Sequence, residues 1–589
     1  MIALSLLLAA AVAQDTAYFQ QHVDYRIEAR LDESSEVLNG RLQLQYRNHA
    51  PQRIDTLWFH LHLNAFRPNS SWARRELEFN ERRFTNLGAD EHAFERVHHV
   101  SVGGVAVTPV YPGAPDSTVM GVPLPRPIEP GGSAVVDIVW DARPSTLPRR
   151  QGRQGRHYDF AQWYPRIAVY DRDGWAVQPL MPQGEFYGEF GDYDVTIDVA
   201  ADQVMGATGV PVDGDPGWAV AAARPDAQPQ MRGNAYPARA AARLGLLPRH
   251  AADGRKQVRW RAERVHHFAW TTNPEYIYEG GMHRDIAVHV LYRPGDTGWA
   301  DGVVVDRTVA ALGWFEGVFG PYPWPQMTNV HRIEGGGTEF PMMVMNGSES
   351  EGLILHEVGH NFVHGVLANN EWREGWLDEG FASFLTNWAH EEAGRGVNWD
   401  GSMNAVVRLE QSGRTQPVGL ASADFRDPGT YSAMTYSKPS LIFRMLRWLV
   451  GDEAFRAALR SYYAQHSLQH VTESDLRTAF NASSPGSLDW FFDQWIHTTG
   501  TLDYGVGDVS TRQTEDGQWV TSVEVVRDGE IWMPVDIQVG DTVQRLTSRE
   551  QRQTVTITTA SRPATVTLDP DRILIDLDPA NNVKAVPGR

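Results

Sequence analysis

His356 and His360 are the residues of this chain whose types and spacing most clearly suggest chemistry. They begin and end a His-Glu-Val-Gly-His string, and a helix with 3.6 residues per turn places both imidazoles on one face, where they can bind one divalent ion. A catalytic zinc ion usually takes three protein ligands and keeps one position for water. Glu379, which follows His360 after a gap of eighteen residues, is the natural third ligand.

A His-Glu-x-x-His string alone is weak evidence, because it arises by chance in roughly one chain in twenty of this length. Chance is a poor explanation of the motif, however, because a Glu follows at the expected downstream spacing and the sequence also indicates where the helix begins and which of its positions are buried. Ser348-x-x-Glu351 predicts a capping box at the start of the helix. Glu357 lies beside the histidines without being needed as a ligand, so it is the candidate general base. The apolar positions predict that the flanks of the helix are buried, namely Leu353, Ile354, Leu355, Val358, Phe362 and Val363.

The amino-acid composition argues against some classes of function and some metal ligands. The chain has 589 residues, which suggests several domains, and a formal charge of −20, which argues against a nucleic-acid partner bound through phosphates. It has no cysteine, so a zinc site must use nitrogen and oxygen ligands.

The first residues predict a secretory signal peptide over 1–13, because an apolar run there ends in Ala-x-Ala, although it lacks a Lys or Arg. We therefore expect a secreted or periplasmic protein. No later stretch reaches eighteen uninterrupted apolar residues, so we expect no stable membrane insertion after the leader is removed.

Residues 17–278 predict an antiparallel β domain. Apolar residues alternate with polar ones over 23–31, 42–46, 134–140 and 195–199, and Asn39-Gly40 predicts the turn between the first two strands. His60 and His62 share a strand face and could bind metal, but without a third donor an exposed or hydrogen-bonded face is favoured.

Two further segments of the β domain have unusual compositions. Arginines set among glycines could bind single-stranded nucleic acid, but the charge of the chain favours a mobile loop running into a packed strand. These arginines are Arg149, Arg150, Arg153 and Arg156. Residues 211–250 are rich in Ala, Pro, Gly and Arg and predict a surface insertion.

We expect residues 282–500 to form the catalytic domain that positions the histidines. A strand is expected over 286–292 and a helix over 303–319, and a Gly-rich run precedes Glu339. Gly336 and Gly337 in that run permit close approach of the backbone to a ligand. Helices follow from 379 to 394 and over 441–450, and three more start at Asp452, Thr472 and Ser487. Period-two strands over 520–526, 531–539, 555–558, 566–568 and 573–577 then predict a small β-sandwich at 503–585.

The chain resembles the aminopeptidase N family of gluzincin zinc metallopeptidases, peptidase family M1. The resemblance rests on the His-Glu-x-x-His string, the eighteen-residue gap and the block Trp376-Leu377-Asp378-Glu379-Gly380-Phe381-Ala382-Ser383. The family usually has Asn where this chain has Asp378. The resemblance implies a multidomain α+β fold with a thermolysin-like catalytic domain between an N-terminal β domain and a C-terminal β-sandwich. Many relatives continue into a helical domain over the active site, which we do not expect here.

The resemblance also implies roles for single residues. Glu339 falls where the family's Gly-x-Met-Glu-Asn segment has the Glu that binds the substrate's free amino group, with Thr338 and Phe340 replacing the Met and Asn. Tyr436 falls on the Tyr of a Tyr-x-Lys-Gly motif, whose hydroxyl stabilises the tetrahedral intermediate, and Tyr431 competes for that role. A second amine anchor is customary in the β domain, where Gln162 is a loose candidate.

These expectations describe a zinc-dependent aminopeptidase that takes peptides with a free N-terminus. His356, His360 and Glu379 would bind one Zn²⁺, and Glu357 and Tyr436 would act in catalysis. The alternatives are a zinc endopeptidase of the same fold and a non-catalytic peptide-binding scaffold.

Overall fold

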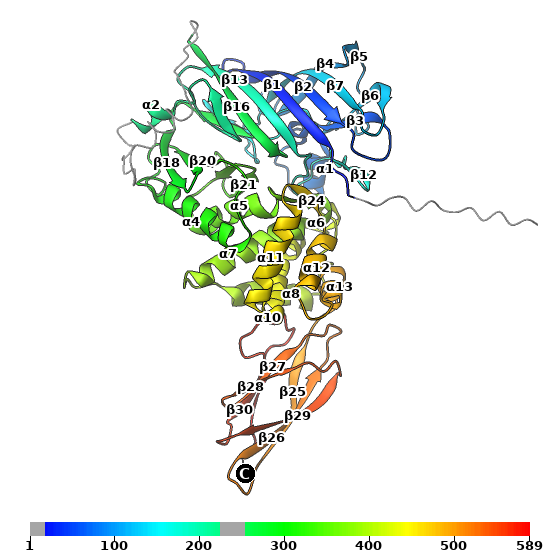
Figure 1. The fold of residues 1–589 in the computed structure, drawn as a ribbon, viewed down its shortest axis with the longest axis vertical. Helices are drawn as coiled ribbons and strands as arrows, with labels where there is room; N and C mark the ends of the chain where they lie inside the picture. The colour runs from blue at the N-terminus through cyan, green and yellow to red at the C-terminus, as the bar shows by residue number, and fades with distance from the viewer. Residues whose placement is uncertain (1–17, 224–253, 589) are drawn as a thin grey trace, which may run out of the picture.

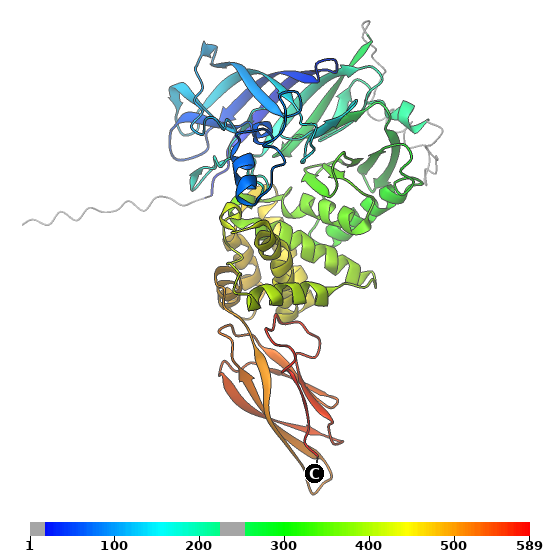
Figure 2. The ribbon, with the colours of Figure 1, turned by 180° about the vertical axis from the view of Figure 1, so that it is seen from behind.

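The computed structural model describes residues 18–223 and 254–588, and it has three parts stacked along its long axis. The predicted leader and most of the predicted insertion at 211–250 lie outside the described residues. Figure 1 shows a β domain at one end, a mainly helical part in the middle and a β-sandwich at the other end, and Figure 2 shows the same order from behind. The predicted multidomain α+β fold is confirmed.

The N-terminal domain is built on an eight-stranded sheet with the order β15-β16-β13-β1-β2-β7-β4-β5. β1 (His22–Asp32) and β2 (Val37–Arg47) pair antiparallel and bury alternate residues, as their period-two pattern predicts. The strands of this sheet pair antiparallel as predicted, with one exception: β1 runs parallel to β13 (Gly191–Ala200). The other strands of this sheet are β4 (Phe94–Val102), β5 (Val105–Ala106), β7 (Ser133–Arg143), β15 (Val210–Asp213) and β16 (Arg255–Val265).

Asn39 and Gly40 do not form the predicted turn. Both lie inside β2, paired with β1, and the chain turns before that strand begins. Gly40 is needed for packing, because a Cβ there would stand 2.4 Å from the ring of Trp140 on β7. A glycine that admits a bulky cross-strand neighbour resembles a turn residue in sequence.

Smaller sheets and helices complete the N-terminal domain. Two sheets have the orders β10-β3-β6 and β14-β17-β9-β8, and β11 pairs with β12 as a hairpin. Their strands are β3 (Ile54–His60), β6 (Val119–Ile128), β8 (Gly152–Gln154), β9 (His157–Phe160), β10 (Arg166–Ile167), β11 (Tyr170–Asp171), β12 (Gly174–Trp175), β14 (Val204–Ala207) and β17 (Trp270–Asn273). The helices are η1 (His62–Ala65), α1 (Ser71–Glu78) and α2 (Trp218–Ala222).

The middle part begins with a five-stranded sheet of order β18-β19-β20-β22-β21. β19 (Ile286–Tyr292) and α4 (Val303–Val318) confirm the predicted strand and helix. β18 (Ile277–His283) pairs with β19, so it belongs to this sheet although the sequence assigned its first residues to the N-terminal domain. β21 (Gly337–Phe340) is the edge strand, next to β22 (Met343–Asn346), and β20 (Gln326–His331) lies at the centre.

Helices pack against this sheet and carry the predicted ligands. α5 (Glu351–Val363) and α7 (Glu379–Glu392) bury their apolar faces, as their patterns predict. The capping box at Ser348 is wrong: Ser350 is the N-cap and its side chain makes no capping hydrogen bond. The other elements of this part are β23 (Leu367–Asn369), α6 (Glu371–Glu374), η2 (Gly375–Leu377), α8 (Trp399–Gln411), η3 (Ser422–Asp424), α9 (Pro428–Ser432), η4 (Ala433–Ser437), α10 (Lys438–Val450), α11 (Asp452–His466), β24 (Gln469–Val471), α12 (Glu473–Ala482) and α13 (Asp489–His497).

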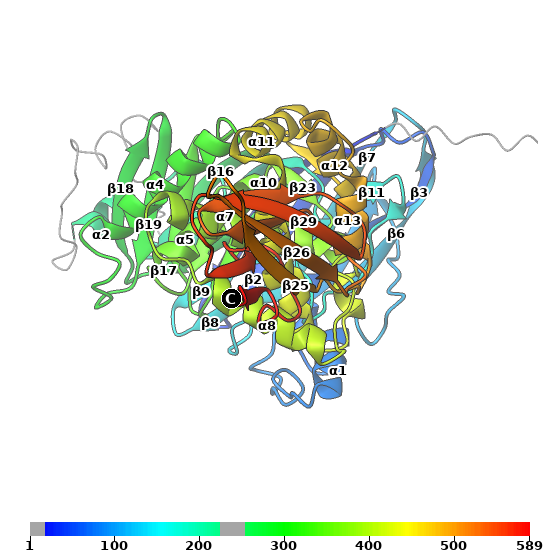
Figure 3. The ribbon, with the colours of Figure 1, turned by 90° about the horizontal axis from the view of Figure 1, so that it is seen from below.

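The C-terminal part is a sandwich of two sheets, ordered β25-β26-β29 and β28-β27-β30-β31. Figure 3, seen from below, shows the sandwich in front of the helices of the middle part. The predicted strand at 573–577 is wrong, since only Asp576 forms an isolated bridge, to Leu502. The strands are β25 (Tyr504–Gln513), β26 (Trp519–Arg527), β27 (Val535–Val539), β28 (Thr542–Leu546), β29 (Arg552–Thr559), β30 (Thr565–Leu568) and β31 (Val583–Ala585).

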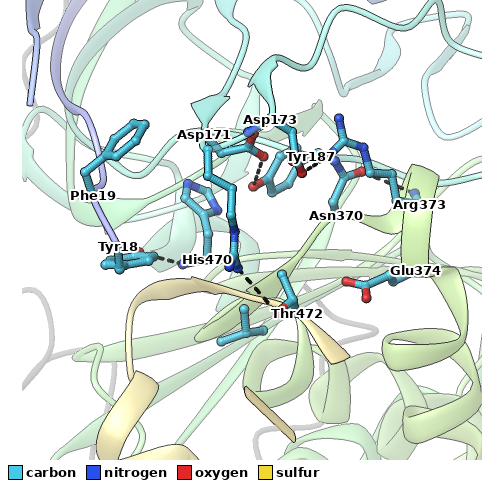
Figure 4. A pocket seen from close by; sticks show the side chains of 12 residues that line it. Tyr18, Phe19, Asp171, Asp173, Tyr187, Asn370, Arg373, Glu374, His470 and Thr472 are labelled. Carbon is cyan, nitrogen blue, oxygen red and sulfur yellow. Dashed lines mark hydrogen bonds and ion pairs between the residues drawn. The ribbon is translucent and has the colours of Figure 1, made fainter. Parts of the chain in front are cut away.

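The N-terminal domain contacts the middle part around a small pocket, shown in Figure 4. The polar groups at its wall pair across the junction: Arg373 of α6 forms an ion pair with Asp173. The Tyr18 hydroxyl accepts a hydrogen bond from the backbone of His470 at 3.0 Å. These pairs attach the β11–β12 hairpin and the first described residues to the helical part.

Among the helices in 18–223 and 254–588, none is long and apolar enough to cross a membrane.

Candidate active site

The nitrogen and oxygen atoms of His356, His360 and Glu379 converge on one point between α5 and α7. Nε2 of His356 lies 3.1 Å from Oε2 of Glu379 and 3.1 Å from Nε2 of His360. Nε2 of His360 lies 3.3 Å from the same Glu379 oxygen. Ligands about 2.0–2.1 Å from a tetrahedral zinc ion stand about 3.3 Å apart, so this triangle has the size that zinc requires.

The surroundings of the triangle also fit a cation. Three lone-pair donors face one another here, and without a cation or protons between them they would repel. Nδ1 of His360 is hydrogen-bonded to Oδ1 of the fully buried Asp378. That bond fixes the tautomer that leaves Nε2 of His360 free for a metal and strengthens the imidazole as a ligand. The three residues therefore suit a zinc ion, with Asp378 as support.

Glu357 projects from α5 beside the triangle and is nearly buried, with 4% of its surface exposed. Burial, with the nearby carboxylate of Glu339, raises the pKa of Glu357 to about 8. Gly337 of β21 makes room for this side chain, because a Cβ at Gly337 would stand 2.0 Å from Oε1 of Glu357. Gly336 has a left-handed backbone with φ of 70°, which lets the chain turn into β21.

Tyr436 reaches the same place from the other side. It lies in a π-helical turn, η4, and its hydroxyl donates a hydrogen bond to Oε1 of Glu379. Such turns re-aim side chains and recur at functional sites. Burial and the charge of Glu379 raise the pKa of Tyr436 well above its ordinary value, so the hydroxyl keeps its proton.

Tyr431, the competing candidate, is buried next to Tyr436 with the ring centroids 6.3 Å apart. Its hydroxyl has no hydrogen-bond partner among the described residues. The contact to Glu379 therefore favours Tyr436 for work at the metal group.

Glu339 lies on the edge strand β21 and is 6% exposed. Its Oε1 has no hydrogen-bond partner in the described part of the chain. Carboxylate oxygens of Glu339, Glu185 and Glu371 lie within 4.8 Å of one another. Two of these carboxylates, Glu339 and Glu185, come from different domains, and together they can accept hydrogen bonds from an ammonium group.

Glu185 is the functional candidate that the sequence reasoning missed. It falls in an aromatic and Gly-rich run, Glu185-Phe186-Tyr187-Gly188-Glu189-Phe190, and an acid set among aromatic residues indicates burial. Gln162, the loose candidate for a second anchor, lies instead against His62, with 3.3 Å between Oε1 and Nδ1. The structure therefore favours Glu185.

Arg150 was also missed, because the sequence predicted a mobile loop here. The packed strand expected after the loop is confirmed as β9, but the predicted loop itself is wrong in part, because Arg153 lies in β8 and both Arg150 and Arg153 are buried. Arg150 forms an ion pair with Glu185, in which both side chains are less than a tenth exposed.

His60 and His62 do not lie on an exposed strand face. Both are buried, with ring centroids 4.4 Å apart, and Trp372 meets both rings edge-on. Neither belongs to a group of three possible metal ligands within the described ranges. They are packing residues at the junction of the two domains.

A cluster of buried histidines lies behind the metal group and could be mistaken for a second metal site. Arg166 contacts Nε2 of His267, whose Nδ1 lies 2.6 Å from Nδ1 of His266. Nε2 of His266 lies 3.2 Å from the carbonyl of His364, which follows α5. Neutral imidazoles can satisfy this whole chain of hydrogen bonds, and burial lowers the pKa of both His266 and His267 well below the ordinary value. The cluster attaches the N-terminal domain to the end of α5.

Comparison with known proteins agrees with this arrangement. Residues 304–495 match the model of the peptidase family M1 domain. The chain is 24% identical over 225 residues to the tricorn protease-interacting factor F2 of Thermoplasma volcanium, covering 33% of this chain and 28% of that protein. It is 27% identical over 156 residues to aminopeptidase N of Streptomyces lividans, covering 25% and 18%. The matched stretches thus span less than a third of these relatives' own length.

Solved structures agree in fold. An M1 zinc metallopeptidase from Deinococcus radiodurans superposes with a TM-score of 0.53 at 17% identity, covering 82% of this chain and 94% of that chain. Legionella pneumophila aminopeptidase A in complex with aspartic acid superposes with a TM-score of 0.63 at 12% identity, covering 95% and 59%. Residues 304–495, which contain the helices that carry His356, His360 and Glu379, are thus similar to the peptidase family M1 domain.

Proposed function

We propose that this chain is a zinc-dependent aminopeptidase that hydrolyses the first peptide bond of peptides with a free N-terminus. The observation that carries the proposal is the position of Glu339, a buried carboxylate with a free oxygen, beside Glu185 and Glu357 at the three-donor group. An unpaired buried carboxylate is costly, so the site favours a ligand that brings a cation. The α-amino group of a peptide is such a cation.

His356, His360 and Glu379 would hold the zinc ion, and Asp378 orients His360. When bound, zinc would polarise the scissile carbonyl and lower the pKa of a water molecule beside it. The carboxylate of Glu357 accepts a proton from the attacking water and later donates it to the leaving amine. The buried position of Glu357 beside the three-donor group supports this role, because a general base must lie within hydrogen-bond reach of the water that it activates.

Tyr436 and the edge strand β21 provide the remaining parts of the proposed site. The hydroxyl of Tyr436 donates a hydrogen bond to the oxygen that becomes negative as the carbonyl carbon turns tetrahedral. β21 is an edge strand and offers unpaired backbone groups, to which an extended peptide can add as a further strand. Glu339 on the same strand then sets where the peptide begins, so one residue is released at a time.

The decisive experiment compares amides of single amino acids with their N-acetylated forms, with and without a chelator. We expect the free-amine substrates to be hydrolysed at least about 10²-fold faster, because an acetylated amine leaves Glu339 buried without a cation. The chelator should stop hydrolysis and added zinc should restore it. Glu339→Ala should lower activity on the free amine much more than on the acetylated form.

Two other outcomes identify the alternatives. Internal cleavage of acetylated peptides as fast as release of first residues would make the protein a zinc endopeptidase. Zinc-loaded protein that binds peptides without cleaving any would make it a binding scaffold.

A further inference from the structure

Arg150 is a buried cation that the N-terminal domain places inside the candidate active site. Its backbone is left-handed, with φ of 59°, and its N–H donates to Oε2 of Glu334 at 2.5 Å. Glu334 directly precedes the Gly-rich run that leads into β21. The loop that carries Arg150 is therefore fixed to the segment that carries Glu339.

The side chain of Arg150 is held in one place. Its guanidinium forms the ion pair with Glu185, and its Cζ lies 4.7 Å from the ring centroid of Phe186. An arginine stacked on an aromatic ring and paired with a carboxylate has little freedom left. Glu185 in turn has a carboxylate oxygen within 4.8 Å of one of Glu339, so a single carboxylate separates the guanidinium from the proposed amine anchor.

One cation and three carboxylates lie together at this place. Arg150 compensates Glu185, whereas Glu339 has a free oxygen among the described residues. The nearby Glu371 is already engaged, with Oε1 at 2.5 Å from Nδ1 of His364 and Oε2 accepting a hydrogen bond from the backbone of Phe186. Because Arg150 already pairs with Glu185, a second substrate cation that approached this pair would meet the guanidinium.

The first residue of a peptide must lie close to Arg150. Its amino nitrogen would pair with Glu339 and its carbonyl oxygen would meet Tyr436, and a single α-carbon separates these two groups of the substrate. Arg150 pairs with Glu185, and a carboxylate oxygen of Glu185 lies within 4.8 Å of one of Glu339, so the positive charge lies close to the side chain that leaves this α-carbon. A Lys or Arg there would bring two like charges together in a buried site.

We propose that Arg150 determines specificity by disfavouring peptides whose first side chain is cationic, while neutral and acidic first residues are accepted. This inference rests on the proposed function, since it takes the amine to be bound at Glu339. Within that function, Arg150 would select a substrate class by repelling the substrates that do not fit, which is a common route to specificity.

The test measures kcat/KM for alanine, glutamate and lysine p-nitroanilides with wild-type protein and with Arg150→Met, Arg150→Lys and Arg149→Met. We expect wild type to favour alanine over lysine at least about tenfold, which corresponds to about 1.4 kcal/mol. Arg150→Met should reduce that ratio at least tenfold, and Arg150→Lys should retain it. Arg149 is the matched control, because its side chain is 29% exposed and pairs with Glu334 at 3.5 Å, so Arg149→Met should leave the ratio unchanged.

Binding of alaninamide and lysinamide to zinc-loaded Glu357→Gln protein, with and without Arg150→Met, gives the same ratio without turnover. An equal ratio with Arg150 and with Met overturns the role of Arg150. If neither amide binds, the amine site and with it the proposed function fail. Circular dichroism of each variant separates these results from a folding defect, and Arg150→Lys carries the test if Arg150→Met does not fold, since a lysine that gave a lower ratio would contradict the proposal.

Discussion

The carboxylate of Glu357 lies directly against the backbone of Gly337: a Cβ at Gly337 would stand 2.0 Å from Oε1 and 2.1 Å from Cδ of Glu357. The glycine is thus part of what sets the position of the proposed base. Gly337→Ala should push the Glu357 side chain away from the metal group. Because displacement of a reacting group by about 1 Å can cost about 10²-fold in rate, we expect kcat to fall about 10- to 100-fold with zinc content unchanged.

Gly335→Ala is the matched control for that variant. Nothing lies within 4 Å of a Cβ built at Gly335, two residues earlier in the same run. We expect its kcat to stay within about twofold of wild type, as for an uncrowded surface substitution. Equal losses in the two variants would show that the run acts through its flexibility and not through contact with Glu357.

Glu357 and Glu379 should separate chemistry from metal binding. Glu357→Gln keeps the shape of the side chain and removes the base, so zinc content should match wild type while turnover falls about 10²- to 10⁴-fold. Glu379→Ala removes a member of the triangle, so the purified chain should carry much less than one zinc. Metal analysis and kinetics on the same preparations check both, and turnover of Glu357→Gln within tenfold of wild type would assign the base elsewhere.

The metal group could be predicted from sequence because its residues lie on local patterns. Two histidines four apart on α5 and a glutamate at the start of α7 lie on regular helices, which bring their side chains together. Strands and helices could likewise be predicted where their periodic apolar pattern continues over many residues. The capping box failed because α5 begins at Glu351, directly after its Ser350 cap, and only backbone geometry decides such a boundary.

Glu185 and Arg150 could not be predicted, because they lie in the N-terminal domain, more than 150 residues before Glu339 and α5. They reach the site only because the two domains pack together. No periodicity connects residues that meet only through domain packing. The Arg150 segment is rich in Gly and Arg, which resembles a solvated loop, yet the partners Glu185 and Glu334 hold it in place. Gly40 shows the same limit, since its contact with Trp140 depends on strand pairing.

Asp378 should govern zinc affinity more than folding. It accepts the hydrogen bond from Nδ1 of His360, and supporting partners of this kind are worth about 10- to 100-fold in metal affinity. Asp378→Ala should weaken zinc binding by that factor in a chelator competition assay, whereas Asp378→Asn, which keeps an acceptor oxygen, should lose less. An unchanged affinity in Asp378→Ala would mean that helix packing alone orients His360.

Tyr436 and Tyr431 can be distinguished by removing one hydroxyl at a time. The hydroxyl of Tyr436 is hydrogen-bonded to Glu379, whereas that of Tyr431 has no hydrogen-bond partner in the part of the chain that the structure describes. Tyr436→Phe should therefore lower kcat about 10²- to 10³-fold with little change in KM, because a bond to the developing oxyanion strengthens only in the transition state. Tyr431→Phe removes the same atom from a neighbouring ring and should change kcat by less than about tenfold. Steady-state kinetics on a free-amine substrate, with zinc content measured in parallel, distinguishes the two. A large loss in Tyr431→Phe together with a small loss in Tyr436→Phe would transfer the oxyanion role to Tyr431, and the contact between Tyr436 and Glu379 would then serve to hold the metal ligand.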